Sequence, residues 1–408
     1  MASIKPFTIA IPDSEIDRLN QKLALASFPD EVDDAGWDYG APLPDVKRLA
    51  TYWKDTYSWR NAEAALNKLP NYLAQIEVEG FGAIDVHFLH QQSQVKNAIP
   101  LLFVHGWPGS FLEATKILPL LADSEKNGGP AFHVIAPSLP NFGFSSSIKK
   151  KGFGQPQYAE TCHKLMLALG YEKYVTQGGD WGFSITRTIG QLYPTHVGAS
   201  HINIIPAYPP SPKSPLSFLK FLSKYFLSLY SAAEFAGLER TQDYQKKQAA
   251  YYEVQSKNPM TIGYALADSP VATLAWIYEK LVIWTDGYEW GEEEVCTWMS
   301  VYWFATAGPA SSVRIYHEST KESSNAFESS MVFNKNIPLG LSYFPREVCL
   351  LPEDWAHSLG PIVYSKRHDK GGHFAAYEVP EKLVGDLRIM FGKGGPAFGV
   401  VEGRDGLV

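Results

Sequence analysis

The 408-residue chain has few cysteines and no excess of basic residues. Cys162, Cys296 and Cys349 are odd in number and far apart, which argues against a disulfide framework or a cysteine-rich zinc site. Free cysteines fit a reducing compartment, so we expect a cytoplasmic location. Lys and Arg total 36 against 43 Asp and Glu, and the net charge of −7 favours no nucleic-acid partner.

The chain also lacks a long apolar run. Its most apolar segment is residues 214–237, "SPLSFLKFLSKYFLSLYSAAEFAG", in which Lys220 and Lys224 stand one helical turn apart. A membrane-spanning helix needs about 18 uninterrupted apolar residues, which this segment does not provide. The first 21 residues lack a basic start followed by an apolar core, so we expect no signal peptide. The sequence therefore predicts a soluble protein with no membrane span.

What the chain does contain is a series of short apolar runs that alternate with helical patterns. Runs such as "IPLLFV", "FHVIAP" and "YVTQG" end in turn residues, and "QYAETCHKLMLALG" is a typical helical stretch between two of them. This alternation predicts an α/β fold, in which a mostly parallel central sheet has helices on both faces.

The alternation stops at residues 206–215, "PAYPPSPKSP", where five prolines prevent regular structure. From there to about residue 320 the pattern is helical throughout, and "VYSKRH" then resumes the strand pattern. We expect an N-terminal helical extension leading into the first strands at 1–95, two parts of the α/β core at 96–205 and 326–408, and a helical lid at 206–325 between them. The apolar segment within the lid makes a homodimer through the lid a further expectation.

Residues 178–182, "GGDWG", follow a strand pattern and precede a helix pattern. A Gly-x-nucleophile-x-Gly turn between a strand and a helix is the nucleophile elbow of the α/β-hydrolase fold. The central residue here is Asp180, and Gly179 and Gly182 permit the tight turn and close helix approach that an elbow needs. An aspartate before a helix is also a common N-cap, so this motif alone leaves a structural role for Asp180 open.

"HGWPGS", which begins at His105, directly follows the strand pattern "PLLFV". A glycine and proline turn at this point leaves backbone N–H groups free, and the amides of Trp107 and Trp181 could form an oxyanion hole. The alternative is an ordinary turn between a strand and a helix.

His373 lies in "RHDKGGHFAAYE", after the last strand pattern. A lone histidine is weak evidence for a catalytic role, but the order nucleophile, acid, histidine is the one expected for this fold. For the acid we favour Glu347 in "FPREVC", which precedes His373 by 26 residues, and Asp354 and Asp369 remain alternatives.

The combination of "HGWPGS", "QGGDWG", "TIGYALADSPVATLAWIYEK", "GGHFAA" and a helical N-terminal extension resembles epoxide hydrolases of the microsomal type, particularly the soluble fungal members. The resemblance covers nearly the whole chain. It implies Asp180 as nucleophile, His373 as base and Glu347 as its acid partner. It also implies two lid tyrosines, which match Tyr251 and Tyr316, while Tyr252 would replace Tyr251 after a shift of one residue.

A carboxylate nucleophile is ionised at neutral pH, so it can attack an sp³ carbon and form an ester without using His373 as a base. An epoxide oxygen leaves as a basic alkoxide and needs a proton, which a phenol can donate. We therefore expect a cofactor-independent enzyme that hydrolyses a small apolar epoxide with water to a vicinal diol. The alternatives are a haloalkane dehalogenase with the same nucleophile and a binding protein that keeps the fold without turnover.

Overall fold

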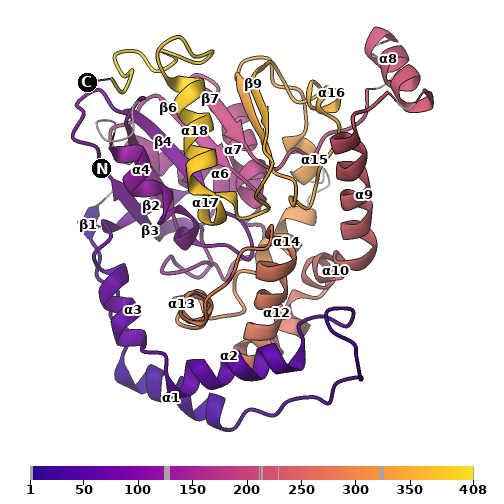
Figure 1. Ribbon diagram of the computed structural model, residues 1–408. Helices are drawn as coiled ribbons and strands as arrows, with labels where there is room; N and C mark the ends of the chain where they lie inside the picture. The colour runs from indigo at the N-terminus through magenta and orange to yellow at the C-terminus, as the bar shows by residue number, and fades with distance from the viewer. Residues whose placement is uncertain are drawn as a thin grey trace.

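A computed structural model describes residues 3–407 apart from 124–128, 211, 213–214, 228 and 322–325. Its described residues form one nine-stranded sheet in the order β1-β2-β3-β5-β4-β6-β7-β8-β9 (Figure 1). The strands are β1 (Ile4–Pro6), β2 (Asn71–Val78), β3 (Gly82–Gln91), β4 (Ile99–Val104), β5 (Phe132–Pro137), β6 (Tyr174–Gly178), β7 (Val197–Ile202), β8 (Leu339–Tyr343) and β9 (Ile362–Arg367).

The two halves of the sheet differ in strand direction. Strands β1, β2, β3 and β5 pair antiparallel with their neighbours, whereas β5, β4, β6, β7, β8 and β9 run parallel. All residues of β4 and β6 are buried, as expected for parallel strands with both faces covered. The covering helices are α4 (Ile117–Ala122) and α18 (Pro380–Phe391) on one face, and α6 (Gln155–Ala168) and α7 (Trp181–Leu192) on the other. The predicted α/β architecture is confirmed.

Within the described residues, the chain between β7 and β8 contains helices and no strand. These helices are α8 (Pro215–Phe226), α9 (Ala232–Lys247), α10 (Ala250–Lys257), α11 (Pro259–Asp268), α12 (Pro270–Ile283), α13 (Glu292–Trp303), α14 (Arg314–Thr320) and α15 (Ala326–Ser330). Shorter helices that follow strands are η1 (Phe111–Ala114), α16 (Glu353–Ala356) and α17 (Ala375–Glu378). None of the helices in the described part of the chain has the length and apolar character needed to cross a membrane.

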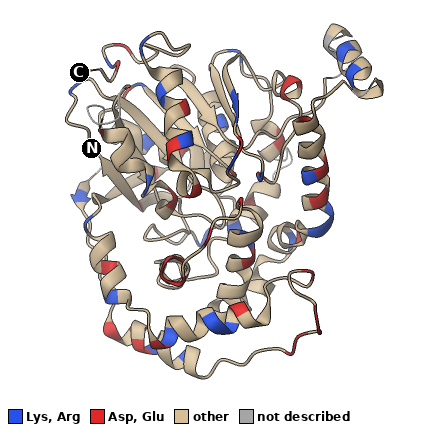
Figure 2. Ribbon diagram, viewed as in Figure 1, with Lys and Arg blue, Asp and Glu red and all other residues tan. Residues whose placement is uncertain are grey.

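Three N-terminal helices lie against this helical section: α1 (Asp13–Ala24), α2 (Leu43–Asp55) and α3 (Trp59–Leu66) (Figure 1). Charges of both signs are interspersed along them (Figure 2). Ion pairs join the two parts, with Arg48 of α2 at 2.7 Å from Glu292 of α13, and Lys22 of α1 at 2.6 Å from Asp268 of α11. The buried indole of Trp53 also donates a hydrogen bond to Ser300 of α13. These contacts hold the N-terminal helices against the helical section.

The return to the sheet occurs earlier than the sequence pattern indicates. The pattern places it at "VYSKRH", but β8 already lies at Leu339–Tyr343. This strand is short and contains Gly340, which interrupts its apolar run. A Cβ on Gly340 would lie 2.4 Å from the sulfur of Met390 in α18, so the close approach of this helix requires a glycine. The same glycine weakens the strand pattern in the sequence.

Candidate active site

Asp180 stands between the end of β6 and the start of α7. Its backbone has φ +50° and ψ −128°, a conformation that costs energy in a non-glycine residue and is typical of a nucleophile elbow. Asp180 occupies the N-cap position, but its side chain makes no capping hydrogen bond. A Cβ on Gly182 would lie 1.9 Å from the carbonyl oxygen of Val104 in β4, so helix and strand approach as closely as an elbow requires. The side chain of Asp180 is therefore aimed away from its helix.

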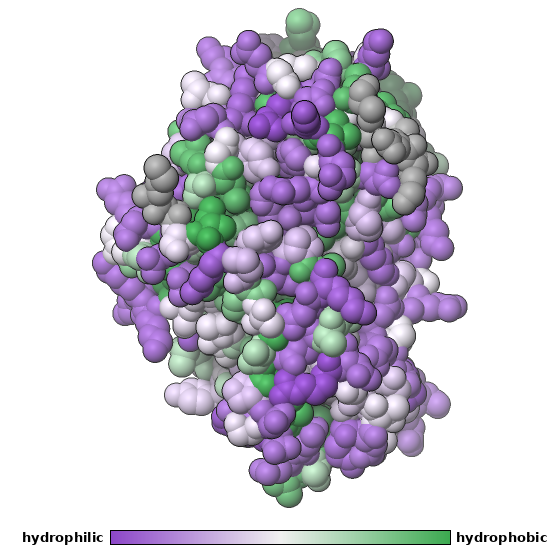
Figure 3. Space-filling model, turned by 90° about the vertical axis from the view of Figure 1, so that its left-hand side faces the viewer, coloured by the Kyte–Doolittle hydropathy of each residue, from purple (hydrophilic) through white to green (hydrophobic). Residues whose placement is uncertain are grey.

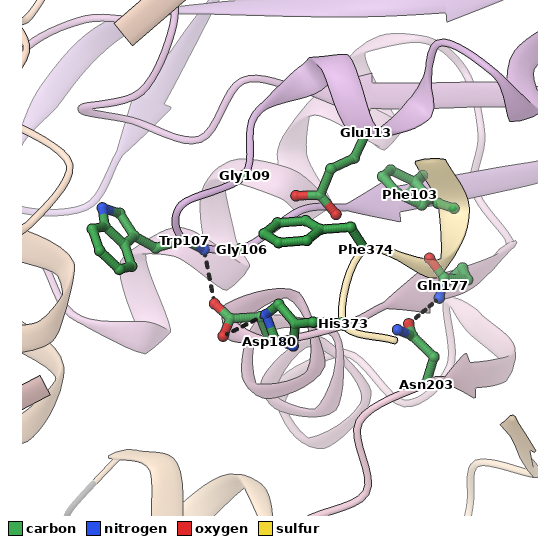
Figure 4. Close-up of a pocket in the computed structure, with 12 residues that line it drawn as sticks. Phe103, Gly106, Trp107, Gly109, Glu113, Gln177, Asp180, Asn203, His373 and Phe374 are labelled. Carbon is green, nitrogen blue, oxygen red and sulfur yellow. Dashed lines mark hydrogen bonds and ion pairs between the residues drawn. The ribbon is translucent and has the colours of Figure 1, made fainter. Parts of the chain in front are cut away.

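The loop after β4 provides a backbone donor to this carboxylate. The N–H of Trp107 donates to Oδ1 of Asp180 at 2.8 Å (Figure 4). Trp181 is the first residue of α7, where a helix provides no partner for the backbone N–H. The two amides proposed from the sequence thus belong to the loop that contacts Asp180 and to the helix that follows it.

Helix α13 holds the Trp107 loop in place. The indole of Trp298 donates to the carbonyl of Pro108 at 2.8 Å, and the hydroxyl of Tyr302 donates to the carbonyl of Gly109 at 2.7 Å. Both donors are buried. Hydrogen bonds to loop carbonyls fix the loop, so the amide of Trp107 stays directed at Asp180.

His373 bridges two carboxylates. Its Nε2 lies 3.3 Å from Oδ2 of Asp180 (Figure 4), and its Nδ1 lies 2.6 Å from Oε1 of Glu347. The backbone N–H of His373 donates to the carbonyl of Trp284, which fixes the loop before α17. Burial alone would lower the pKa of His373, but the carboxylates of Glu347 and Asp180 outweigh it and raise that pKa well above its ordinary value.

The three candidate acids occupy different surroundings. Glu347 is buried. Its Oε1 accepts a hydrogen bond from the backbone N–H of Val348 and also lies within hydrogen-bonding distance of Nδ1 of His373. Asp354 instead lies 3.2 Å from Lys224, and Asp369 pairs with Lys382 on the surface. The structure brings Glu347 to His373 and places both alternatives elsewhere.

A cavity of about 340 Å³ opens on the side of Asp180 that faces the helical section. Its lining includes Tyr251, Tyr252 and Tyr316. The ring of Trp107 stacks on Tyr251 with centroids 5.1 Å apart, and Trp181 meets Tyr316 edge-on at 4.9 Å. Aromatic packing thus brings helices α10 and α14 over Asp180.

The phenols of Tyr251 and Tyr316 are both buried, and burial raises the pKa of each well above its ordinary value. Both therefore remain protonated at neutral pH. Tyr316 has no hydrogen-bond partner for its hydroxyl among the described residues, while that of Tyr251 lies 2.9 Å from the hydroxyl of Tyr244. Tyr252 lines the same cavity but is only partly buried, which favours Tyr251 as the matching tyrosine.

Several residues at the site were not singled out in the sequence. Tyr244 of α9 contacts Tyr251, Trp284 after α12 contacts His373, and Glu113 of η1 lines a small cavity beside Asp180. None belongs to a motif with a chemical signature. Tyr244 and Trp284 resemble ordinary packed aromatics, and Glu113 resembles a solvated acid in the first turn of a helix.

The arrangement combines the carboxyl group of Asp180 on a strained turn, a backbone donor to it, a histidine paired with a second carboxyl group, and phenols above. A carboxyl group on a strand-turn-helix elbow with this His–acid pair is typical of the α/β-hydrolase fold, and residues 99–281 match the family model described as alpha/beta hydrolase fold. Residues 4–114 match a second model, described as Epoxide hydrolase N terminus.

Whole-chain comparisons specify the family. Epoxide hydrolase 1 of Sus scrofa is 35% identical, over 96% of this chain and 89% of its own length. The Aspergillus niger epoxide hydrolase structure has a TM-score of 0.80 at 32% identity, covering 94% of this chain and 95% of that one. The juvenile hormone epoxide hydrolase structure of Bombyx mori has a TM-score of 0.84 at 28% identity, with 95% and 93% covered. The chain belongs to the epoxide hydrolase family and is a hydrolase that acts on epoxides.

Proposed function

We propose that the chain hydrolyses an epoxide to a vicinal diol through an ester on Asp180. The observation that carries this mechanism is the position of His373, with Nδ1 on Glu347 and Nε2 toward Asp180. A base held in this way next to a carboxylate can activate water against an ester of that carboxylate.

In the first step, Oδ2 of Asp180 attacks an epoxide carbon and the ring carbon–oxygen bond breaks. Oδ1 stays on the amide of Trp107. The leaving oxygen takes a proton from Tyr251 or Tyr316, which becomes a phenolate. A proton donor is needed because an alkoxide is a poor leaving group, and the unpartnered hydroxyl of Tyr316 is free to serve.

In the second step, water attacks the ester carbonyl carbon and gives a proton to Nε2 of His373. The amides of Trp107 and Trp181 receive the oxyanion. The acyl carbon–oxygen bond then breaks, and the diol oxygen takes the proton from His373. Asp180 is left as a carboxylic acid, and its proton returns to the phenolate, so every group regains its starting state.

The substrate side of the site is the aromatic cavity. Apolar side chains such as Ile204, Phe327, Met331 and Leu351 share its lining with the tyrosines. This lining favours an apolar epoxide over a charged one. We further propose that residues 206–325 act as the lid, since α10 and α14 provide the tyrosines above the nucleophile.

The decisive experiment uses a His373→Gln variant, mixed with styrene oxide and measured by intact mass. We expect an adduct equal in mass to the epoxide, because the ester forms but water is not activated. Diol formation at the wild-type rate without any adduct would exclude the covalent mechanism.

Two alternative functions predict other results. A dehalogenase would release halide from alkyl halides, and a Tyr251→Phe, Tyr316→Phe double variant would do so at an unchanged rate. A binding protein would form no diol.

We also propose a homodimer through the lid, in a cytoplasmic enzyme. Helix α8 and the residue after it expose Leu216, Leu219, Phe226 and Leu227, while α8 projects from one side of the molecule (Figure 1). The opposite side is mostly hydrophilic, with its apolar residues separated (Figure 3). Light scattering of the wild type and a Leu219→Lys, Phe226→Lys variant tests the dimer, which the variant should dissociate to monomer.

A further inference from the structure

A second, smaller cavity lies beside the nucleophile and is separate from the aromatic one. The centre of a water molecule can occupy about 10 Å³ of this cavity. That volume is enough for one water. Asp180 and His373 both line it, so any molecule inside reaches the two groups of the proposed hydrolysis step (Figure 4). A substrate cannot enter so small a space.

Glu113 is the second acidic residue, after Asp180, that lines this cavity. It belongs to η1, and its carboxyl lies against the Trp107 loop, since a Cβ on Gly109 would be 1.5 Å from its Oε1. No Lys or Arg of the described residues forms an ion pair with it. Of the two amides that also line the cavity, the nitrogen of Gln177 donates to the side-chain oxygen of Asn203 at 2.8 Å, whereas Oε1 of Gln177 has no partner among the described residues. Apart from Asp180, the cavity therefore offers a water two side-chain acceptors, Oε1 of Gln177 and the carboxyl of Glu113, and Glu113 is the one that lies against the Trp107 loop.

We propose that Glu113 positions the hydrolytic water of the second step, which rests on the proposed function. The water oxygen faces the ester carbon of Asp180, one of its hydrogens goes to Nε2 of His373, and the other is hydrogen-bonded to the carboxyl of Glu113. When the oxygen attacks, the first hydrogen moves to His373 as a proton. The second stays on the oxygen that becomes part of Asp180, so Glu113 gains and loses no proton.

The electrostatics of Glu113 agree with a hydrogen-bonding role. Burial raises the pKa of Glu113 to about 8, the charge of Asp180 raises it further, and His373 and a backbone hydrogen bond from Gly106 lower it. At neutral pH the carboxyl is therefore protonated in the resting enzyme. A neutral carboxyl can accept a hydrogen bond from water without competing with His373 for its proton, so its function requires hydrogen bonding and no charge.

The test separates the two chemical steps in Glu113→Leu and Glu113→Gln variants. Single-turnover mixing with styrene oxide gives the rate of ester formation from tryptophan fluorescence and the rate of ester decay from quenched intact mass. For Glu113→Leu we expect unchanged ester formation and about 10- to 100-fold slower ester decay. Because decay alone slows, kcat and KM should fall by the same factor and kcat/KM should stay constant. Glu113→Gln keeps the hydrogen bond and should decay within about threefold of wild type at pH 7.

The controls distinguish the possible failures. Glu160→Gln changes a buried glutamate on α6, away from the site, and should leave both rates unchanged. If Glu113→Leu forms no ester, Glu113→Met provides a flexible side chain for the same measurement. Unchanged decay in the apolar variant would overturn the proposal, as would equal slowing in the Leu and Gln variants. Absence of an ester in the wild type would instead reject the proposed function itself.

Discussion

The two sides of the candidate active site are held by different forces. On the sheet side, hydrogen bonds fix Asp180 and His373, with Trp107 donating at 2.8 Å and Glu347 lying at 2.6 Å from the imidazole. On the lid side, ring packing places Tyr251 and Tyr316, and the hydroxyl of Tyr316 has no partner among the described residues. The proposed nucleophile and base are thus positioned by directional bonds, whereas the two phenols are positioned mainly by ring contacts, with one hydroxyl–hydroxyl bond between Tyr251 and Tyr244.

This difference has a chemical reason. A carboxylate and an imidazole form strong, directional hydrogen bonds, so a small displacement of either group lowers the reaction rate. Fixed backbone amides keep such displacements small. A phenol that donates a proton needs only to reach the leaving oxygen, so ring contacts are sufficient to place Tyr316, and Tyr251 needs no more than its one bond to Tyr244. We infer that the sheet side determines whether the reaction occurs and that the lid side determines which epoxide is accepted.

The strongest test of the sheet side is Asp180→Ala. We expect diol formation to fall at least about 10⁴-fold, because Asp180 is the only carboxyl residue among the described ones that line the aromatic cavity. Product assays by mass spectrometry measure the loss. Asp369→Ala is the matched control, since Asp369 is exposed and pairs with Lys382. Substantial turnover in the Asp180 variant would show that water attacks the epoxide directly.

The lid side is tested by removing its hydroxyls. Tyr316→Phe and Tyr251→Phe should each slow ester formation about 10-fold or more, and the double variant about 10³-fold, because the alkoxide then leaves without a proton. Rapid mixing with an epoxide measures this step. Tyr252→Phe is the control and should change the rate by less than about threefold. A large effect of Tyr252→Phe would assign the proton donor to Tyr252.

The pH dependence separates the two sides within one enzyme. The pKa of His373 is raised partly by the charge of Asp180, which is lost when the ester forms. His373 must be neutral to accept a proton. Below the pKa that His373 has in the ester form of the enzyme, ester decay should therefore slow up to about tenfold for each pH unit. Ester formation needs no neutral imidazole, and intact mass should show more ester as the pH falls. A constant ester fraction from pH 8 to 5 would contradict this order of events.

The smallest expected effect is on stability. Because burial raises the pKa of Glu113 from 4.5 to about 8, the folded state binds a proton that the unfolded state loses above pH 4.5. Stability contributed by this proton is full below pH 4.5 and is lost as the pH rises toward 8. Glu113→Gln escapes this loss, so its Tm should exceed that of wild type by about 2–4 °C at pH 8 and match it near pH 4.5. Calorimetry at both pH values checks the sign.

Much of the fold could be predicted from local pattern. Strands β4, β5 and β6 are apolar runs ended by turn residues, and the proline-rich stretch after β7 marks the change to helices. Strand β8 could not be predicted, because Gly340 interrupts its pattern for the sake of a contact with Met390 in α18. A glycine required by a distant helix carries no local sign of that requirement.

The same division applies to the site. By itself the sequence determined the chemical groups and their order, since the turn around Asp180 and the loops of Trp107 and His373 are continuous motifs that dictate their own backbone shape. Only the tertiary structure decided which acid reaches His373, which tyrosines stand over the nucleophile and that Glu113 faces a cavity the size of one water. These residues lie tens to hundreds of positions apart in the sequence, and only the packing of the whole chain brings them together around Asp180.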